Sequence, residues 1–469
     1  MSSISALNSL LSSSSSSDGI DLSALLQAAT GASSEGIDVN EAVSAAISAA
    51  EAPEQQWEAQ ETTLQSQTTA LTQIQTDATN LDNDMQSLNS LTGPLSAVAV
   101  SSSNSSIVSA SAAAGTTAGD HVVVVHNLAA TDSWSSNTVA SATTALAAGS
   151  FTITPAGGTA TTISTGTGTS TLTNVANTIN SDDLGVTASV VTDATGARLA
   201  IVSNTSGSAA DFTVAAGTGG LSFTEAVPGA NASLTVDGLT IASASNTVTG
   251  VVPGLTLNLL SASPGTQVSL SVAPDVSQAS AAINQFVTDY NTLIGDLNTQ
   301  YTDTGSGEGP LGSDSTVRNL QSELLGALGY TSTGTDAITT SLASMGISVG
   351  NDGTLTVDDS TLSTALQNNF SDVQNFFQGT SLNGFANSLD QQLTSFISPG
   401  DGAFTVDLQS ISDQNTDLQN DISNFQTNYI APLQTQLQAS YSNAEILLQQ
   451  LPTEMKQIDE ELGLNNSSS

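Results

Sequence analysis

The sequence predicts an α+β protein of several domains, with coiled-coil-forming helices at both ends, a mixed α/β leg segment and β-rich head domains inserted between them. Near both ends, apolar residues recur with a mean period of 3.5, which is typical of a coiled-coil seam. In the Thr/Gly-rich middle the period changes to two, which indicates strands. The 469 residues suggest about three domains. The expected segments are 1–35 (disordered), 36–95 (helical), 96–277 (β-rich head domains), 278–405 (a helical leg domain with a short hairpin) and 406–469 (a coiled-coil helix and tail).

The charge balance excludes several kinds of partner. The chain has 43 acidic residues and only three basic ones, Arg198, Arg318 and Lys456, and its formal charge is −40. Nucleic acid and anionic membranes bind basic patches, so neither is expected as a partner. No run approaches the ~18 apolar residues of a membrane span, so membrane insertion is not expected either. Without cysteine, disulfides and thiolate catalysis are excluded.

The amino-terminal segment is predicted to be disordered. The serine run Ser12–Ser17 has nothing to bury. Residues 1–11 contain neither a basic residue nor a continuous apolar run, so a Sec-type signal peptide is not expected. The protein is therefore expected to be cytoplasmic, or exported by a route that removes no signal.

The stretch Gly36-Ile37-Asp38-Val39 is expected to open the first helix, with Asp38 as its N-cap and Glu41 completing a capping box. Pro53 interrupts it, because proline disfavours helical geometry in the preceding residue. The first seam follows and ends at Gly93-Pro94. Its two apolar rows are Trp57, Leu64, Leu71, Ala78 and Met85, and Ile74, Leu81 and Leu88.

The middle of the chain is expected to consist of short strands and turns. Asp237-Gly238 is one of several turn signals between the apolar runs. Strands are expected at 106–111, 121–126, 151–154, 186–191, 199–202, 233–236 and 255–260, with one helix at 172–179. Helices are then expected at 278–297, 317–328, 362–370 and 373–377, with a hairpin turn at 351–353.

The second seam is predicted to slip. Tyr429 and Tyr441 are 12 residues apart, which is no multiple of seven. A kink or break is expected at Ile430–Pro432, since proline inside a helix costs about 3 kcal/mol, and a second weak point at Pro452. The residues proposed for self-assembly here are Leu418, Ile422, Phe425, Tyr429, Leu437, Leu448, Leu451, Met455 and Ile458.

No catalytic, metal-binding or cofactor-binding constellation is predicted, and the chain is not expected to be an enzyme. His121 and His126 are five residues apart on a predicted strand and so point to opposite faces. A hydrolase is disfavoured by the scarcity of His and Lys, and the Gly-rich loop at 303–308 lacks the ligand spacing of an EF-hand. Trp134 could be a binding anchor.

Several motifs together resemble the flagellar hook-associated protein 2 family of filament-capping proteins. Gly36–Val39 followed by Ala50-Glu51-Ala52-Pro53 is similar to its amino-terminal signature. Residues 172–203 resemble the repeat of flagellins and hook proteins. Leu234–Gly238, and the stretch from there to Tyr290-Asn291, is similar to the start of the family's carboxy-terminal region. The chain departs from the family in its scarcity of Lys and Arg, its longer amino terminus and its two prolines in the last helix.

The resemblance implies a homo-oligomeric ring, usually of five subunits, at the distal tip of a bacterial flagellar filament outside the cell. Such a ring holds emerging flagellin while each subunit folds and inserts. Implied partners are flagellin, the hook–filament junction proteins, and the flagellar export apparatus with its chaperone. The head is expected to face outward, where it could adhere to surfaces.

One alternative is a secreted Ser/Thr-rich adhesin or surface-layer protein, which would need neither helical seams at both ends nor a closed ring. For the seams themselves, the alternative is a helical hairpin within one chain. Gln and Ala dilute the seams, and joining helices about 320 residues apart has an entropic cost. We therefore hypothesise that the terminal helices are frayed in the monomer and become ordered in the ring or against flagellin.

Overall fold

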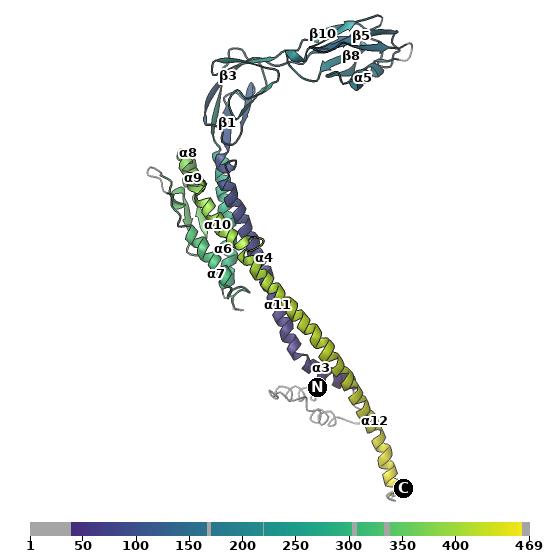
Figure 1. Cartoon of the computed structure of the whole chain (residues 1–469), viewed down its shortest axis with the longest axis vertical. Coiled ribbons are helices and arrows are strands. Elements are labelled where there is room, and N and C mark those ends of the chain that lie inside the picture. Colours follow the sequence, from purple (N-terminus) through teal and green to yellow (C-terminus); the bar gives the residue numbers. More distant parts are fainter. Residues whose placement is uncertain (1–38, 167–169, 219, 303–306, 333–337, 462–469) are drawn as a thin grey trace. The chain divides into compact units, whose positions relative to one another are not determined.

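The computed structural model describes residues 39–166, 170–218, 220–302, 307–332 and 338–461 (Figure 1). It confirms the α+β class. The helices are α3 Val39–Ala50, α4 Ala52–Asn89, α5 Leu172–Ser181, α6 Val276–Tyr301, α7 Ser315–Ala327, α8 Asp359–Asn368, α9 Phe370–Gln378, α10 Phe385–Ile397, α11 Ala403–Phe425 and α12 Ala431–Glu461. Shorter helical turns are η1 Pro94–Ser96, η2 Ser208–Ala210, η3 Ala343–Met345 and η4 Gln426–Ile430. None of the described helices is long and apolar enough to cross a membrane.

The strands are short and antiparallel. They are β1 Val98–Ser102, β2 Val108–Ala112, β3 Gly119–Asn127, β4 Ser133–Ser136, β5 Gly149–Pro155, β6 Thr161–Thr165, β7 Val186–Asp193, β8 Gly196–Ser203, β9 Phe212–Ala216, β10 Phe223–Val227, β11 Ala232–Val236, β12 Leu239–Ser243, β13 Thr247–Thr249, β14 Leu255–Leu259, β15 Val268–Pro274, β16 Ile347–Val349 and β17 Leu355–Val357. All seven strands predicted from the sequence are present, as is the hairpin between β16 and β17.

The chain divides into two compact units. Among the described residues, the first contains those up to Asp82, Tyr290–Leu325 and those from Gln391 onward; the second contains those in Asn83–Asp289 and Gly326–Asp390. All the β-sheets and α5, α8 and α9 belong to the second unit, whereas α3, α11 and α12 belong to the first.

The head strands form two separate hydrophobic cores by nested insertion. The chain enters through β1 and leaves through β15, and these two strands are neighbours in a five-stranded sheet of order β1-β15-β3-β11-β12. This sheet shares one core with the three-stranded sheet β13-β14-β2. The stretch from β4 to β10 interrupts that sheet between β3 and β11, which also pair directly. Its two sheets and α5 enclose the second core.

Local sequence explains much of the head. The run Val122–Val125 alternates in the structure: Val123 and Val125 are fully buried, whereas Val122 is exposed. Asp237 and Gly238 have φ values of 49° and 84°, which is the left-handed geometry of a two-residue hairpin turn, here between β11 and β12. Trp134 faces the second core: its indole nitrogen donates to the carbonyl oxygen of Phe212 at 3.0 Å. Trp134 is therefore a partly buried side chain packed against this core and not an exposed binding anchor.

The irregularity predicted near Pro432 is present, but as a π-helical turn rather than a break. Helix α11 continues through η4, a π-helix, into α12, and the Ala431 backbone N–H donates to the Gln426 carbonyl. Proline cannot donate the next helical hydrogen bond, and the wider turn accommodates its ring. Three α-helical turns take about 11 residues. One residue added by the π-turn therefore explains the 12-residue spacing from Tyr429 to Tyr441. The second predicted weak point was wrong, because α12 continues past residue 452.

Candidate assembly interface

The first helix packs against the last one. Its buried face consists of Val43, Ala46 and Ile47, as the sequence pattern predicted. Ile430 in η4 and Leu437 and Tyr441 in α12 complete this cluster, and all six side chains are at most 9% exposed. The start of the described chain is therefore joined to its last helix by apolar side chains. Asp38, the proposed cap of the first helix, lies outside the described residues.

An aromatic contact follows along the same pair of chain ends. The rings of Trp57 in α4 and Phe425 in α11 meet edge to face, with centroids 5.3 Å apart. Phe425 also stacks on Tyr429 at 5.1 Å. The structure thus unites three of the proposed seam residues. Tyr429 is still 51% exposed, so one side of this aromatic group remains accessible.

Glutamine amides replace the usual basic partners of the carboxylates between these helices. Gln419 Nε2 in α11 donates to Glu61 Oε1 in α4 at 2.7 Å. Gln426 Nε2 donates to Glu54 Oε2. An amide donates a hydrogen bond to a carboxylate without neutralising its charge, so the helix pair keeps its negative charge. These contacts were not predicted; the signal in the sequence was the abundance of Gln beside the scarcity of Lys and Arg.

The remaining seam residues have different environments. In α4, Leu64 is half-buried, as are Leu418 and Ile422 in α11. Leu71, Ile74, Leu81, Met85 and Leu88 are at most 1% exposed within the single chain. The side chains of Leu448, Leu451, Met455 and Ile458 lie outside the part of the chain that is described. The buried side chains of α4 have almost no exposed surface in the single chain, and a role of any seam residue in self-assembly remains a prediction.

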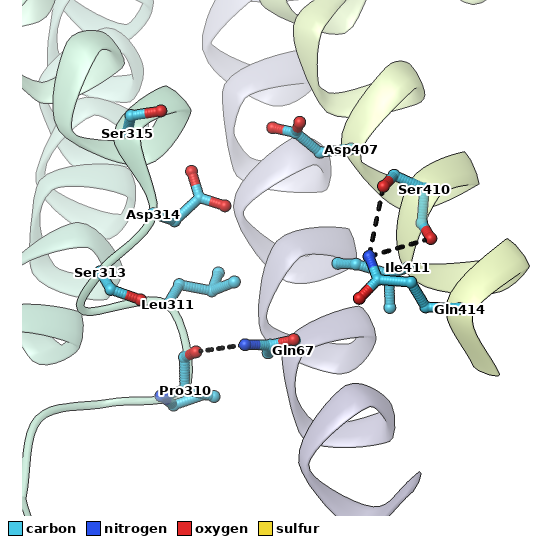
Figure 2. A pocket seen from close by; sticks show the side chains of 10 residues that line it. All are labelled: Gln67, Pro310, Leu311, Ser313, Asp314, Ser315, Asp407, Ser410, Ile411 and Gln414. Atoms are coloured by element: carbon cyan, nitrogen blue, oxygen red, sulfur yellow. Dashed lines mark hydrogen bonds between the residues drawn. The ribbon is translucent and has the colours of Figure 1, made fainter. Parts of the chain in front are cut away.

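A depression of about 320 Å³ lies in the first unit, between α4, the start of α7 and α11 (Figure 2). Gln67 Nε2 spans part of it and donates to the Pro310 carbonyl at 3.2 Å. Asp314 caps α7, because its Oδ1 accepts from the backbone N–H groups of Thr316 and Val317. The residues lining the depression include no histidine, lysine or arginine. It offers no acid–base pair with a cationic partner and does not resemble a catalytic site.

The two histidines have local partners on the head sheet. His121 Nδ1 lies 2.7 Å from Asp237 Oδ2, and His126 Nε2 lies 2.8 Å from Thr235 Oγ1. Hydrogen bonds from the His121 ring and the Val122 N–H lower the pKa of Asp237. Among the described residues, no group of three or more His, Asp and Glu side chains could hold a metal ion. The loop at 303–308 lies mostly outside the described residues.

Comparisons with known proteins match both ends of the chain. Residues 35–132 match the family model "Flagellar hook-associated protein 2 N-terminus", and residues 229–453 match the corresponding C-terminus model. These two matches together cover well over half of the chain. They leave out residues 133–228, which nearly coincide with the nested insertion from β4 to β10.

Curated relatives and solved structures are similar to the same regions. The A-type flagellar hook-associated protein 2 of Pseudomonas aeruginosa is 34% identical over 177 residues, 36% of each chain. The B-type protein of P. aeruginosa is 28% identical over 317 residues, 60% of this chain and 64% of that protein. The matches therefore span less than two thirds of these relatives. The crystal structure of the flagellar cap protein FliD D1-D2-D3 domains from Escherichia coli has a TM-score of 0.59 and 26% identity, covering 73% of this chain and 99% of that one.

Proposed function

Because this chain belongs to the flagellar hook-associated protein 2 family, we propose that it caps the distal end of a bacterial flagellar filament. The observation that carries the proposal is the match of both chain ends, in order, to the two models of one family. The packing of α3 against α12 supports it, because these helices come from the two matched ends. Proteins of this family are structural and not enzymes, in agreement with the sequence prediction.

In its finer form, the proposal is a homo-oligomeric ring, of five subunits by family resemblance, that promotes flagellin folding and insertion. Flagellin and the hook–filament junction proteins would be its partners at the filament. The export apparatus and its chaperone would deliver it to the outside of the cell without removing a signal peptide. Two features support a shared interface with other helices: the exposed side of Tyr429, and Ile446 and Leu447 of α12, which are 53% and 63% exposed. Surface adhesion through the head stays a prediction from the sequence.

The proposal is tested by deleting the gene in the source bacterium and imaging its flagella. A filament end without a cap would not retain emerging flagellin subunits. We therefore expect flagellar hooks without filaments, and monomeric flagellin in the medium. The gene supplied in trans should restore filaments, and negative-stain images of the purified protein should show closed rings. Filaments of normal length in the deletion strain would contradict the proposed function.

Salt should strengthen the proposed ring. Each chain carries a formal charge of −40, and the described helix-pair contacts use neutral amides, so subunits that assemble repel one another. Raising ionic strength from about 0.01 M to 0.15 M shortens the Debye length from about 30 Å to 8 Å. Sedimentation velocity should then show a larger fraction of oligomer. Sucrose at matched osmolality, which screens no charge, serves as the control. A ring that dissociates as salt is added would show that repulsion does not limit assembly.

A further inference from the structure

Two aspartates share a hydrogen bond between α4 and α6 in the second unit. The side chain of Asp84 is hydrogen-bonded to that of Asp289. Two ionised carboxylates have no proton to donate, so this bond exists only when one of the two is protonated. Asp289 Oδ2 already accepts a hydrogen bond from Gln285 Nε2 at 3.0 Å. Because Asp289 already acts as an acceptor, the shared proton is assigned to Asp84.

The surroundings of Asp84 also favour a neutral carboxyl group. Its Oδ2 atom is buried and accepts no hydrogen bond from a donor among the described residues. Met85 next to it in α4 and Phe286 in α6 are fully buried. An uncompensated charge in such a place is costly, whereas a protonated acid bonded to a carboxylate is not.

Among the described residues, no cationic side chain compensates the negative charge of Asp84 and Asp289. Burial raises the pKa of Asp84 to about 7, and the hydrogen bond to Asp289 and its negative field act in the same direction. From α9, the polar group that reaches this end of α4 is the neutral amide of Gln378, whose Nε2 donates to the Leu88 and Ser90 carbonyls at 3.1 Å. Farther along α4, Asp77 accepts from Gln73. In the described part of the chain, Asp289 is therefore the only charged group whose field acts on the pKa of Asp84.

We propose that Asp84 and Asp289 form a proton-dependent clasp, which holds the end of α4 against α6 and weakens when the shared proton is lost. This inference does not depend on the capping function. The folded chain binds a proton at Asp84 that the unfolded chain releases at the ordinary carboxyl pKa of 3.8. By linkage, the clasp stabilises the fold fully below that value, and its contribution is lost as the pH rises through about 7.

The experiment follows amide hydrogen exchange of residues 83–89 and 280–289 in the full chain between pH 5 and pH 8.5, because a chain of several domains has no single melting transition. In the wild type, protection should fall as the pH rises from 5 to about 7 and then level off, because above pH 7 the folded and the unfolded chain have both released the proton. Asp84→Asn should flatten this fall, because the amide donates to Asp289 without a titrating proton. Asp421→Asn in α11 is the matched control: it removes one exposed charge far along the sequence and should leave the pH dependence unchanged.

The same pH dependence of protection in the wild type and in Asp84→Asn would overturn the clasp. If the variant does not fold, the wild type still decides the matter through the ¹³C chemical shift of the Asp84 carboxyl carbon. A titration midpoint near pH 7 supports the proposal, and a midpoint below pH 5 overturns it.

Discussion

Leu437→Asp is expected to abolish the pairing of α3 with α12. Leu437 is 5% exposed and packs in the cluster with Val43, Ala46 and Ile47. The substitution removes about 2 kcal/mol of apolar burial and places a carboxylate among side chains that offer it no partner, which costs several kcal/mol more. Residues 39–50 should therefore lose their hydrogen-exchange protection. If the paired ends form the ring, rings and filament growth should be lost with it.

The neighbouring residue provides a matched control. Gln436 is exposed, so Gln436→Asp adds the same charge one residue away without entering the cluster. It should keep both the protection of α3 and the rings. Two other outcomes are informative. Loss of α3 protection with intact rings would separate this helix pair from assembly. Full protection in Leu437→Asp would mean that the cluster does not hold the helices together.

Phe385→Ala should produce the largest loss of stability in the helical part of the second unit. Phe385 is fully buried at the start of α10, and its ring lies within 6.0 Å of the rings of Phe286, Phe376, Phe377 and Tyr330. Truncating such a residue removes its transfer free energy and leaves a cavity, at a cost of about 3–5 kcal/mol. Because the chain has several domains, the change is best measured by hydrogen exchange of α9 and α10 rather than by a single global transition.

Val349→Ala in the β16–β17 hairpin is the control for this prediction. Val349 belongs to the same unit but is 50% exposed. Its truncation should change local stability by less than about 0.5 kcal/mol. Equal losses of stability for the two variants would indicate that the aromatic side chains around Phe385 are not the core of this region.

The sequence was most informative where side chains repeat with a clear period. The face of α3, the buried row of α4 from Leu71 to Leu88 and the strands around Val123 and Leu234 all follow from 3.5-, 3.6- or two-residue spacing. The predicted helix around 278–297 is part of α6, and the Pro432 discontinuity is real. The resemblance to the family came from the order of several weak motifs, and the comparisons confirm it.

Other elements had no comparable signal. Strands such as β4 (Ser133–Ser136) and β6 (Thr161–Thr165) are short and rich in Ser and Thr, so their apolar alternation is too weak to identify them. Helix α10 was missed although Phe385, Leu389, Leu393 and Phe396 are buried on it. The Asp84–Asp289 contact joins residues about 200 positions apart, and periodicity within a helix cannot reveal a partner on another one.

Because of the nested topology of the head, one continuous insertion forms the second core and can be removed or replaced as a unit. The insertion begins after β3 and ends before β11, and these strands pair directly, with Ser233 opposite Asn127. An intervening stretch whose two ends already touch can be lengthened, exchanged or shed without re-routing the host sheet. The insertion from β4 to β10 can thus vary in evolution while the five-stranded host sheet is kept. A protein engineer could graft foreign cargo at the same two junctions.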